Sequence, residues 1–231
     1  KIAIIACLAK YYHRVGLEKV NTFQSVIIVL LILVIPIMLV LSQPDLGTSI
    51  LIALSGLVVI WLAGLNLKYF IYSFITLLIS MPFVISFLKP YQKLRILTFL
   101  NPDRDPLGAG YQIIQSKIAV GSGGITGKGF LKGTQSYLDF LPEKHTDFIF
   151  TLFSEEHGFI GSLGLLLIYI IIIYRILKTG AISRSFFAKF FCFGFGSSIF
   201  FCVAVNMSMV LGLLPIVGSP LPIMSYGGSS M

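Results

Sequence analysis

Charge is scarce in this sequence. Only 11% of the residues are Asp, Glu, Lys or Arg, whereas a soluble globular domain carries roughly 25%. Hydrophobic residues make up 56% of the chain, and its mean hydropathy is +0.94. So few charges cannot cover a protein surface with polar groups. The composition therefore excludes an ordinary soluble domain, and we expect lipid to be the main solvent.

Cysteine and histidine are also sparse, with three of each. The cysteines lie in apolar stretches, at Cys7, Cys192 and Cys202. Their scatter excludes a disulfide framework and a cysteine metal site. The histidines are just as dispersed, at His13, His145 and His157. We therefore expect no metal site built from protein side chains.

Two common catalytic motifs are missing. Residues 121–129 are rich in glycine, but the position five before Gly127 is Ser122, and Lys128 is followed by glycine rather than Ser or Thr. This spacing does not match a nucleotide phosphate loop. We expect tight turns there, with a backbone-amide cradle for a lipid pyrophosphate as the alternative. Neither Ser122 nor Ser229 lies in the G-x-S-x-G motif of serine hydrolases.

Long hydrophobic runs are abundant. A membrane helix needs about 20 apolar residues, and five runs reach that length: 23–42, 46–65, 69–88, 148–174 and 187–213. Partial spans lie at 2–12 and from about Leu221 onward. We expect an all-α, polytopic transmembrane bundle. Residues 1–231 would form a single integral membrane domain that is truncated at both ends.

Basic residues in the short loops indicate the topology. One set of loops has Glu18 as its only acid and carries Lys10, Arg14, Lys19, Lys68, Arg175, Lys178, Arg184 and Lys189. By the positive-inside rule this set is cytoplasmic, so the long loop 89–146 faces outward. Loops of that length are usually functional or disordered, and the partly apolar stretch 111–120 argues against disorder, so we expect the active site there. The net charge of +8 comes without a nucleic-acid-binding signature, so we expect membrane lipid rather than nucleic acid as its partner.

Two acids lie where the long loop meets the next span. Leu141-Pro-Glu-Lys-His-Thr-Asp-Phe148 contains Glu143 and Asp147. Low dielectric near lipid disfavours an ionised carboxyl group, and a carboxylate tuned in this way can act as a general base near neutral pH. The alternative is a helix start, with Thr146 or Asp147 as the N-cap. Asp45, after Gln43-Pro44, could likewise be a simple helix cap.

Glu155 and Glu156 interrupt the span 148–174 together with His157 and Gly158. Carboxylates at membrane depth are costly and usually face a cavity or a partner. The outer loop is also rich in cations, which could be solvated, face lipid headgroups or hold a pyrophosphate: Lys89, Lys93, Arg95, Arg104, Lys117, Lys128, Lys132 and Lys144.

Several motifs occur in the order expected of the SEDS family, which includes RodA, FtsW and SpoVE. They are Gln43-Pro-Asp-Leu-Gly-Thr, Asn101-Pro-Asp-Arg-Asp-Pro-Leu-Gly-Ala-Gly-Tyr-Gln, Gly121-Ser-Gly-Gly, Leu141-Pro-Glu-Lys-His-Thr-Asp-Phe, Gly212-Leu-Leu-Pro and Ser225-Tyr-Gly-Gly-Ser-Ser. The resemblance runs essentially from end to end. Gly133-Thr-Gln-Ser-Tyr-Leu-Asp-Phe-Leu-Pro resembles the RodA branch of cell elongation more than the FtsW branch of cell division.

The resemblance implies a peptidoglycan glycosyltransferase in the bacterial inner membrane. The resemblance also implies ten spans in the full protein. At about 20 residues a span, about seven of them are wholly or partly present here. Asp147 matches the essential outer-loop carboxylate, and Glu143 is a second catalytic candidate. The candidate substrate-binding residues are Lys1, Asp45, Arg95, Arg104, Lys117 and Lys144. Lys1 resembles the lysine of a motif whose acidic partner is missing, so we expect the fragment itself to be inactive.

The implied substrates are lipid II and an undecaprenyl-pyrophosphate-linked glycan. The implied protein partners are a class B penicillin-binding protein and membrane proteins of the elongation complex. A divalent cation, Mg or Mn, could assist the leaving pyrophosphate. Two other functions stay open: a lipid II flippase, which Glu155 and Glu156 would favour, and a non-catalytic scaffold. A flippase predicts repeats and charges at the bilayer midplane, whereas this chain shows no repeat and its acids gather at the outer edge.

Overall fold

The computed structural model describes six stretches of the chain, 1–16, 19–43, 45–87, 90–101, 108–133 and 145–226. Within them all regular elements are helices. Three of these helices are long and apolar enough to cross a membrane, and shorter apolar helices accompany them. The expected all-α, polytopic membrane fold is confirmed. The chain divides into two compact units, residues 1–88 with 172–201 and residues 89–171 with 202–231.

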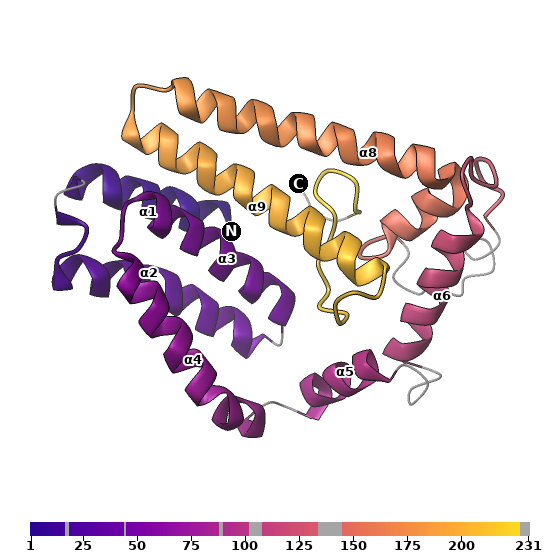
Figure 1. Ribbon diagram of the computed structural model, residues 1–231, viewed down its shortest axis with the longest axis horizontal. Coiled ribbons are helices and arrows are strands. Elements are labelled where there is room, and N and C mark those ends of the chain that lie inside the picture. The colour runs from indigo at the N-terminus through magenta and orange to yellow at the C-terminus, as the bar shows by residue number, and fades with distance from the viewer. Residues whose placement is uncertain (17–18, 44, 88–89, 102–107, 134–144, 227–231) are drawn as a thin grey trace. The chain divides into compact units, whose positions relative to one another are not determined.

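The first unit is built around four helices drawn at the indigo and purple end of the chain (Figure 1). They are α1 (Ile2–Val15), α2 (Phe23–Ser42), α3 (Leu46–Leu62) and α4 (Leu67–Phe87). Each matches an expected span within a few residues. The core lies between α1, α2 and α3, where Ile5, Leu8 and Val59 are fully buried. The opposite face of α2 is exposed and apolar, as a lipid-facing helix requires.

Two long helices contribute to both units. They are α8 (Ile149–Ile182) and α9 (Phe186–Val210), which match the expected spans 148–174 and 187–213. In the first unit the end of α8 packs closely on the start of α9. A Cβ added at Gly180 would lie only 2.7 Å from the Cβ of Cys192. Small residues at such contacts let membrane helices approach closely, which gains dispersion energy that lipid alone cannot provide.

In the second unit, the expected outer loop 89–146 is partly helical. It contains α5 (Pro90–Leu100) and α6 (Ala109–Ser122). Three candidate site residues in this loop, Arg104, Glu143 and Lys144, lie outside the described residues.

The expected start of a span near Leu221 is wrong as far as Tyr226, because residues 222–226 form turns and bends. Pro220 and Pro222 both disfavour a helix there. The amide of Leu221 donates to Ser225 Oγ at 2.7 Å, which closes a turn instead.

A break divides α8 near its start. Gly158 has φ 67° and ψ −162°, which no helical residue adopts, and it lies in the expected interruption at residues 155–158. The glycine-rich loop 123–132 fills this break. The amides of Lys128 and Gly129 donate to the carbonyls of Glu155 and Glu156, both at 3.0 Å. In return, the amides of residues 159 and 160 donate to carbonyls of the loop at 2.9 and 3.1 Å. The backbone groups that the break would leave unbonded at membrane depth are thereby satisfied.

Candidate active site around Asp147

Asp147 lies in a turn that leads directly into α8. Residues 145–148 form this turn, and the helix begins at Ile149. It begins later than an N-cap at Thr146 or Asp147 would place it, so that alternative is wrong. Phe148, the last residue of the turn, and Phe150, in the first turn of the helix, are buried, with 1% and 6% of their surface exposed. Asp147 itself is half-buried. The aromatic anchors hold the carboxylate at the entrance to a membrane helix.

The segment after α9 approaches this carboxylate. A Cβ added at Gly218 would lie 3.4 Å from Asp147 Oδ2, so the bare Cα of Gly218 leaves room for the acid. The carbonyl of Asp147 accepts a 2.8 Å hydrogen bond from Asn206 Nδ2, near the end of α9. The Asp147 region is therefore built from two segments about sixty residues apart, since the bond joins positions separated by 59.

A hydroxyl pair joins three helices beside the site. Ser116 Oγ of α6 donates to the carbonyl of Val210, at the end of α9, over 2.7 Å. Thr151 Oγ1 of α8 lies 3.0 Å from the same Ser116 Oγ and acts as the donor, because the serine hydrogen is already used. Ser116 and Thr151 are fully buried. Buried polar groups that are fully bonded to one another fix the relative placement of the elements that carry them.

The expected substrate-binding cations of this unit lie on α5 and α6. Lys117 is exposed, and its side chain covers Gly212, because a Cβ added at Gly212 would collide with Lys117 Cε. Lys117 and Asp147 thus contact the same segment, 206–219. Arg95 is half-buried on α5. The structure therefore places the Lys117 side chain against the segment that also contacts Asp147.

The other two substrate-binding candidates, Lys1 and Asp45, lie in the first unit. Asp45 is the N-cap of α3, and its Oδ1 accepts a 2.9 Å bond from the amide of Thr48. The helix-cap interpretation of Asp45 is therefore confirmed, while a role in substrate binding stays a prediction. Lys1 precedes α1 and is half-buried. Its substrate role is also a prediction.

An ion pair fastens the loop into the break of α8. Lys128 Nζ lies 2.7 Å from Glu155 Oε1, and the Glu155 side chain is only 1% exposed. Glu156 Oε1 accepts a hydrogen bond from the amide of Leu131 at 3.2 Å. Both carboxylates at membrane depth thus have partners in the loop. The amides of Lys128 and Gly129 are used in the break, which favours the interpretation of 121–129 as turns rather than as a phosphate cradle.

Removing Lys128 should strongly destabilise the protein. Lys128→Met removes the positive charge that lies 2.7 Å from the buried Glu155 carboxylate, which costs about 3–5 kcal/mol of unfolding free energy. The double variant Lys128→Met/Glu155→Gln removes both charges and should recover most of that loss. Thermal unfolding of the purified full-length variants in detergent measures both. Equal stability of the single variant and the wild type would show that the pair contributes nothing.

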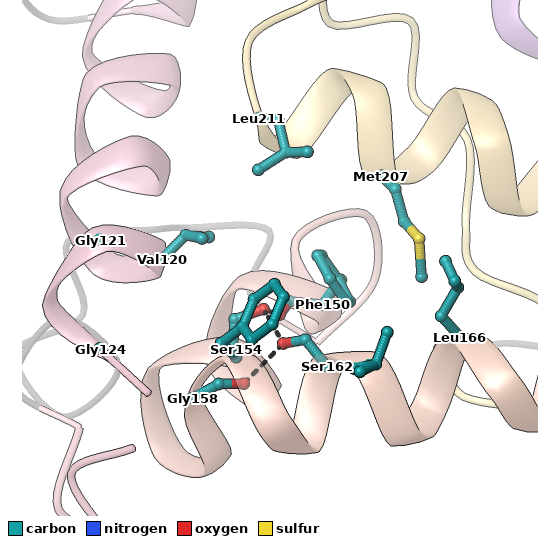
Figure 2. Close-up of a pocket in the computed structure, with 12 residues that line it drawn as sticks. Val120, Gly121, Gly124, Phe150, Ser154, Gly158, Ser162, Leu166, Met207 and Leu211 are labelled. Carbon is teal, nitrogen blue, oxygen red and sulfur yellow. Dashed lines mark hydrogen bonds between the residues drawn. The ribbon is translucent and has the colours of Figure 1, made fainter. Parts of the chain in front are cut away.

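An apolar cavity of about 470 Å³ lies in the second unit, between α6, α8 and the end of α9 (Figure 2). Its walls include Phe150, Leu166, Met207 and Leu211. The polar groups at its base are self-satisfied, because Ser162 Oγ lies 2.9 Å from the Gly158 carbonyl and 3.1 Å from Ser154 Oγ. Such a cavity suits a hydrocarbon ligand better than a sugar.

Metal-binding side chains do not gather in the described part of the chain. Among those residues, no three His, Cys, Asp or Glu side chains lie close enough to hold an ion. The described donors do not fit a resident metal centre, and the mechanism proposed for this chain assigns no step to one.

Comparison with known proteins identifies this arrangement. The family model FTSW_RODA_SPOVE, described as "Cell cycle protein", matches residues 1–231. The chain belongs to the FtsW/RodA/SpoVE family. The peptidoglycan glycosyltransferase MrdB of Escherichia coli K12 is 46% identical over the whole chain, which covers 62% of that protein. The stage V sporulation protein E of Bacillus subtilis is 38% identical over the whole chain, which covers 66% of that protein.

Similarity within the FtsW/RodA/SpoVE family favours the RodA branch, as expected. A probable peptidoglycan glycosyltransferase FtsW of Buchnera aphidicola is 38% identical, against 46% for MrdB, the RodA protein. The structure of a peptidoglycan synthase complex, solved to describe how polymerization and crosslinking are coordinated, aligns with a TM-score of 0.78 and 33% identity, over 99% of this chain and 62% of that one. RodA of Thermus thermophilus aligns with a TM-score of 0.64 and 24% identity, over 100% of this chain and 58% of that one. At this identity it supports the fold alone. The chain spans about 62% of the length of the E. coli relative that it matches.

Two residues beside Asp147 were not predicted as site residues. Asn206 is a buried amide in an otherwise apolar span, and such polar residues are often functional in membranes. Ser225 opens the Ser-Tyr-Gly-Gly-Ser-Ser motif, which served only to indicate the family. Hydropathy and motif order carry no information on which distant segment these side chains contact.

Proposed function

We propose that the full-length protein containing this chain is a peptidoglycan glycosyltransferase. It polymerises lipid II into glycan strands at the outer face of the bacterial inner membrane during cell elongation. The observation that carries the proposal is the half-buried carboxylate of Asp147, which lies in the turn before α8 and is followed by the buried aromatic residues Phe148 and Phe150. Similarity to proteins named peptidoglycan glycosyltransferase over the whole chain supports it.

In the proposed reaction, the sugar 4-hydroxyl of an incoming lipid II attacks the anomeric carbon of the lipid-linked glycan. The new glycosidic C–O bond forms as the bond from the anomeric carbon to the pyrophosphate oxygen breaks, and the configuration inverts. The Asp147 carboxylate takes the hydroxyl proton, because an alcohol is a weak nucleophile. Undecaprenyl pyrophosphate leaves with the bonding electron pair. Glu143 is the second candidate for this base.

Cations stabilise the leaving pyrophosphate in this proposal. Fixed positive charge is most effective where negative charge develops in the transition state. Lys117 is the best-placed described candidate, because it contacts the segment that holds Asp147. Arg95, Arg104 and Lys144 are further candidates. Substrate phosphates often hold Mg²⁺ together with one or two carboxylates, so we propose that a divalent cation arrives with the substrate, and a chelator titration of polymerisation measures that requirement.

The apolar cavity between α6, α8 and α9 is proposed to hold part of the polyprenyl chain. Its hydrocarbon walls support this role, as does Phe150, which lines the cavity and follows Asp147 by three residues.

Filling the cavity should weaken substrate binding. Leu166→Trp replaces a lining side chain with a larger one that takes up part of the cavity. A loss of about 1 kcal/mol of binding free energy raises KM roughly fivefold. Leu167 is 50% exposed and does not line the cavity, so Leu167→Trp is the matched control. Steady-state kinetics with a polyprenyl-linked substrate measure both variants. Equal KM values would remove the cavity from the proposal.

The site is proposed to face the outside of the cell, and a class B penicillin-binding protein and elongation-complex membrane proteins are the proposed partners. The short-loop basic residues support this orientation. Similarity to a peptidoglycan synthase complex supports the first partner.

The decisive experiment for the function reconstitutes the full-length protein in vesicles that contain labelled lipid II. Glycan strands are scored on a gel, and lipid II translocation is scored separately. Polymerisation without translocation is the expected result. Translocation without glycan would favour a flippase. The main argument for a flippase was the pair Glu155 and Glu156, but both acids bond to the loop, at Lys128 and at the amide of Leu131. Neither activity would favour a scaffold.

A further inference from the structure

The main chain that carries Asp147 is held at consecutive positions by a distant segment. The carbonyl oxygens of residues 145–147 all accept hydrogen bonds from residues 206–226. The donors, in order, are the Tyr226 amide at 2.9 Å, Ser225 Oγ at 2.7 Å and Asn206 Nδ2 at 2.8 Å. Three successive bonds fix the direction of a peptide chain far better than one, because each removes a rotational freedom that the others leave.

Two of the three donors are side chains that are themselves locked. Asn206 is fully buried, and its Nδ2 also donates to the Ser219 carbonyl at 2.7 Å. Both hydrogens of its amide are therefore used. Ser225 Oγ accepts a 2.7 Å bond from the Leu221 amide and donates its single hydrogen to the Thr146 carbonyl. Neither side chain can rotate without losing a bond to its own segment.

Packing within α9 alone does not explain an asparagine at position 206. A buried amide in an apolar membrane helix is costly unless its groups are bonded. An apolar residue would fill the same place in α9 without that cost. What the amide adds is a link between three segments: α9, the loop at Ser219 and the turn at Asp147. The turn is thereby fixed against two elements at once.

We propose that Asn206 and Ser225 are positioning residues for Asp147. Their hydrogen bonds hold the main chain at residues 146 and 147 so that the carboxylate meets the attacking hydroxyl. The inference rests on the proposed function. A general base must lie about 2.6–3.2 Å from the proton that it removes. A misplacement of about 1 Å costs roughly 100-fold in rate. These residues act through Asp147 and do not touch the substrate.

The test uses full-length protein and measures kcat, KM for lipid II and the folded fraction of each variant. Ser225→Ala removes the donor to Thr146, and we expect kcat per folded molecule to fall about 10- to 100-fold while KM stays within twofold. Ser225→Thr keeps a hydroxyl and should restore most of the rate. Asn206→Ala should follow the same pattern. Ser55→Ala is the matched control, because Ser55 is a buried membrane-helix serine that bonds only to its own helix.

Combination with Asp147→Asn separates positioning from mere stability. If Ser225 acts through the carboxylate, Ser225→Ala should not lower the residual rate of Asp147→Asn any further. Unchanged kcat in both Ser225→Ala and Asn206→Ala would overturn the positioning role while leaving Asp147 as the base. A further drop on the Asp147→Asn background would also overturn it. Normal polymerisation by Asp147→Asn alone would instead reject the proposed base, and with it the function proposed for this site.

Discussion

Replacement of Asp147 by asparagine is expected to lower kcat for lipid II polymerisation by roughly 100- to 10,000-fold, the usual contribution of a general base. Asparagine has nearly the same shape, so the main-chain bond from Asn206 to residue 147 should persist and the protein should stay folded. Only the capacity to accept a proton is lost. A gel assay of lipid II polymerisation with the full-length protein and its partner measures the rate.

Two further variants test the assignment of Asp147. Asp147→Glu keeps the carboxylate but moves it by one methylene, so its rate should fall between those of Asp147→Asn and the wild type. Glu143→Gln probes the second candidate in the same motif. Loss of activity in Glu143→Gln together with a normal rate in Asp147→Asn would transfer the base to Glu143. Thermal unfolding of each variant separates lost chemistry from lost structure.

Replacement of Gly127 by alanine is expected to expel the loop from the break in α8. Gly127 has φ +81°, and an added Cβ would collide with the main-chain carbonyl of Glu156. The left-handed backbone costs a non-glycine residue about 1–3 kcal/mol, and an overpacked contact adds about 1–3 kcal/mol. The expected loss of unfolding free energy is therefore about 2–6 kcal/mol. Denaturation of the purified full-length variant measures it.

Two other glycines separate strain from collision. Gly124 has φ +56° but open space around it, so Gly124→Ala should show the strain alone, about 1–3 kcal/mol. Gly164 lies in α8 with no neighbour within 4 Å and no positive φ. Gly164→Ala should be neutral or slightly stabilising, because alanine favours a helix over glycine by up to about 1 kcal/mol. The loss of unfolding free energy should be largest at Gly127, smaller at Gly124 and smallest at Gly164. Any other order would contradict the packing of the loop.

Hydropathy predicted the helices well because burial in lipid depends on each segment by itself. The span 23–42 coincides with α2, and 46–65 and 187–213 differ from α3 and α9 by a few residues. The interruption of α8 was also predictable, since two adjacent glutamates disfavour a continuous apolar helix. What fills the break was not predictable. The bonds from residues 128 and 129 to residues 155 and 156 are tertiary, and no local pattern encodes such a pairing.

The candidate site was predicted only in part, for a similar reason. A motif placed Asp147 at the edge of a span, and the structure places it in the turn just before α8. The turn residues from Leu221 were expected to begin a helix, because their hydrophobicity is high and their hydrogen bonds to distant carbonyls are invisible in sequence. The contact of Lys117 with Gly212 depends on the packing of α6 against the end of α9, which composition does not specify.

The order in which these contacts can form during synthesis follows from their separation along the chain. The ion pair between Lys128 and Glu155 spans only 27 positions, whereas the bonds that hold residues 147 and 146 span 59 and 79. Contacts close in sequence close smaller loops and form earlier. The broken helix can thus be completed while the ribosome is still translating α9. The turn that carries Asp147 receives its bond from Ser225 only after that residue has emerged, so a nascent chain completes the broken helix before this turn is fixed.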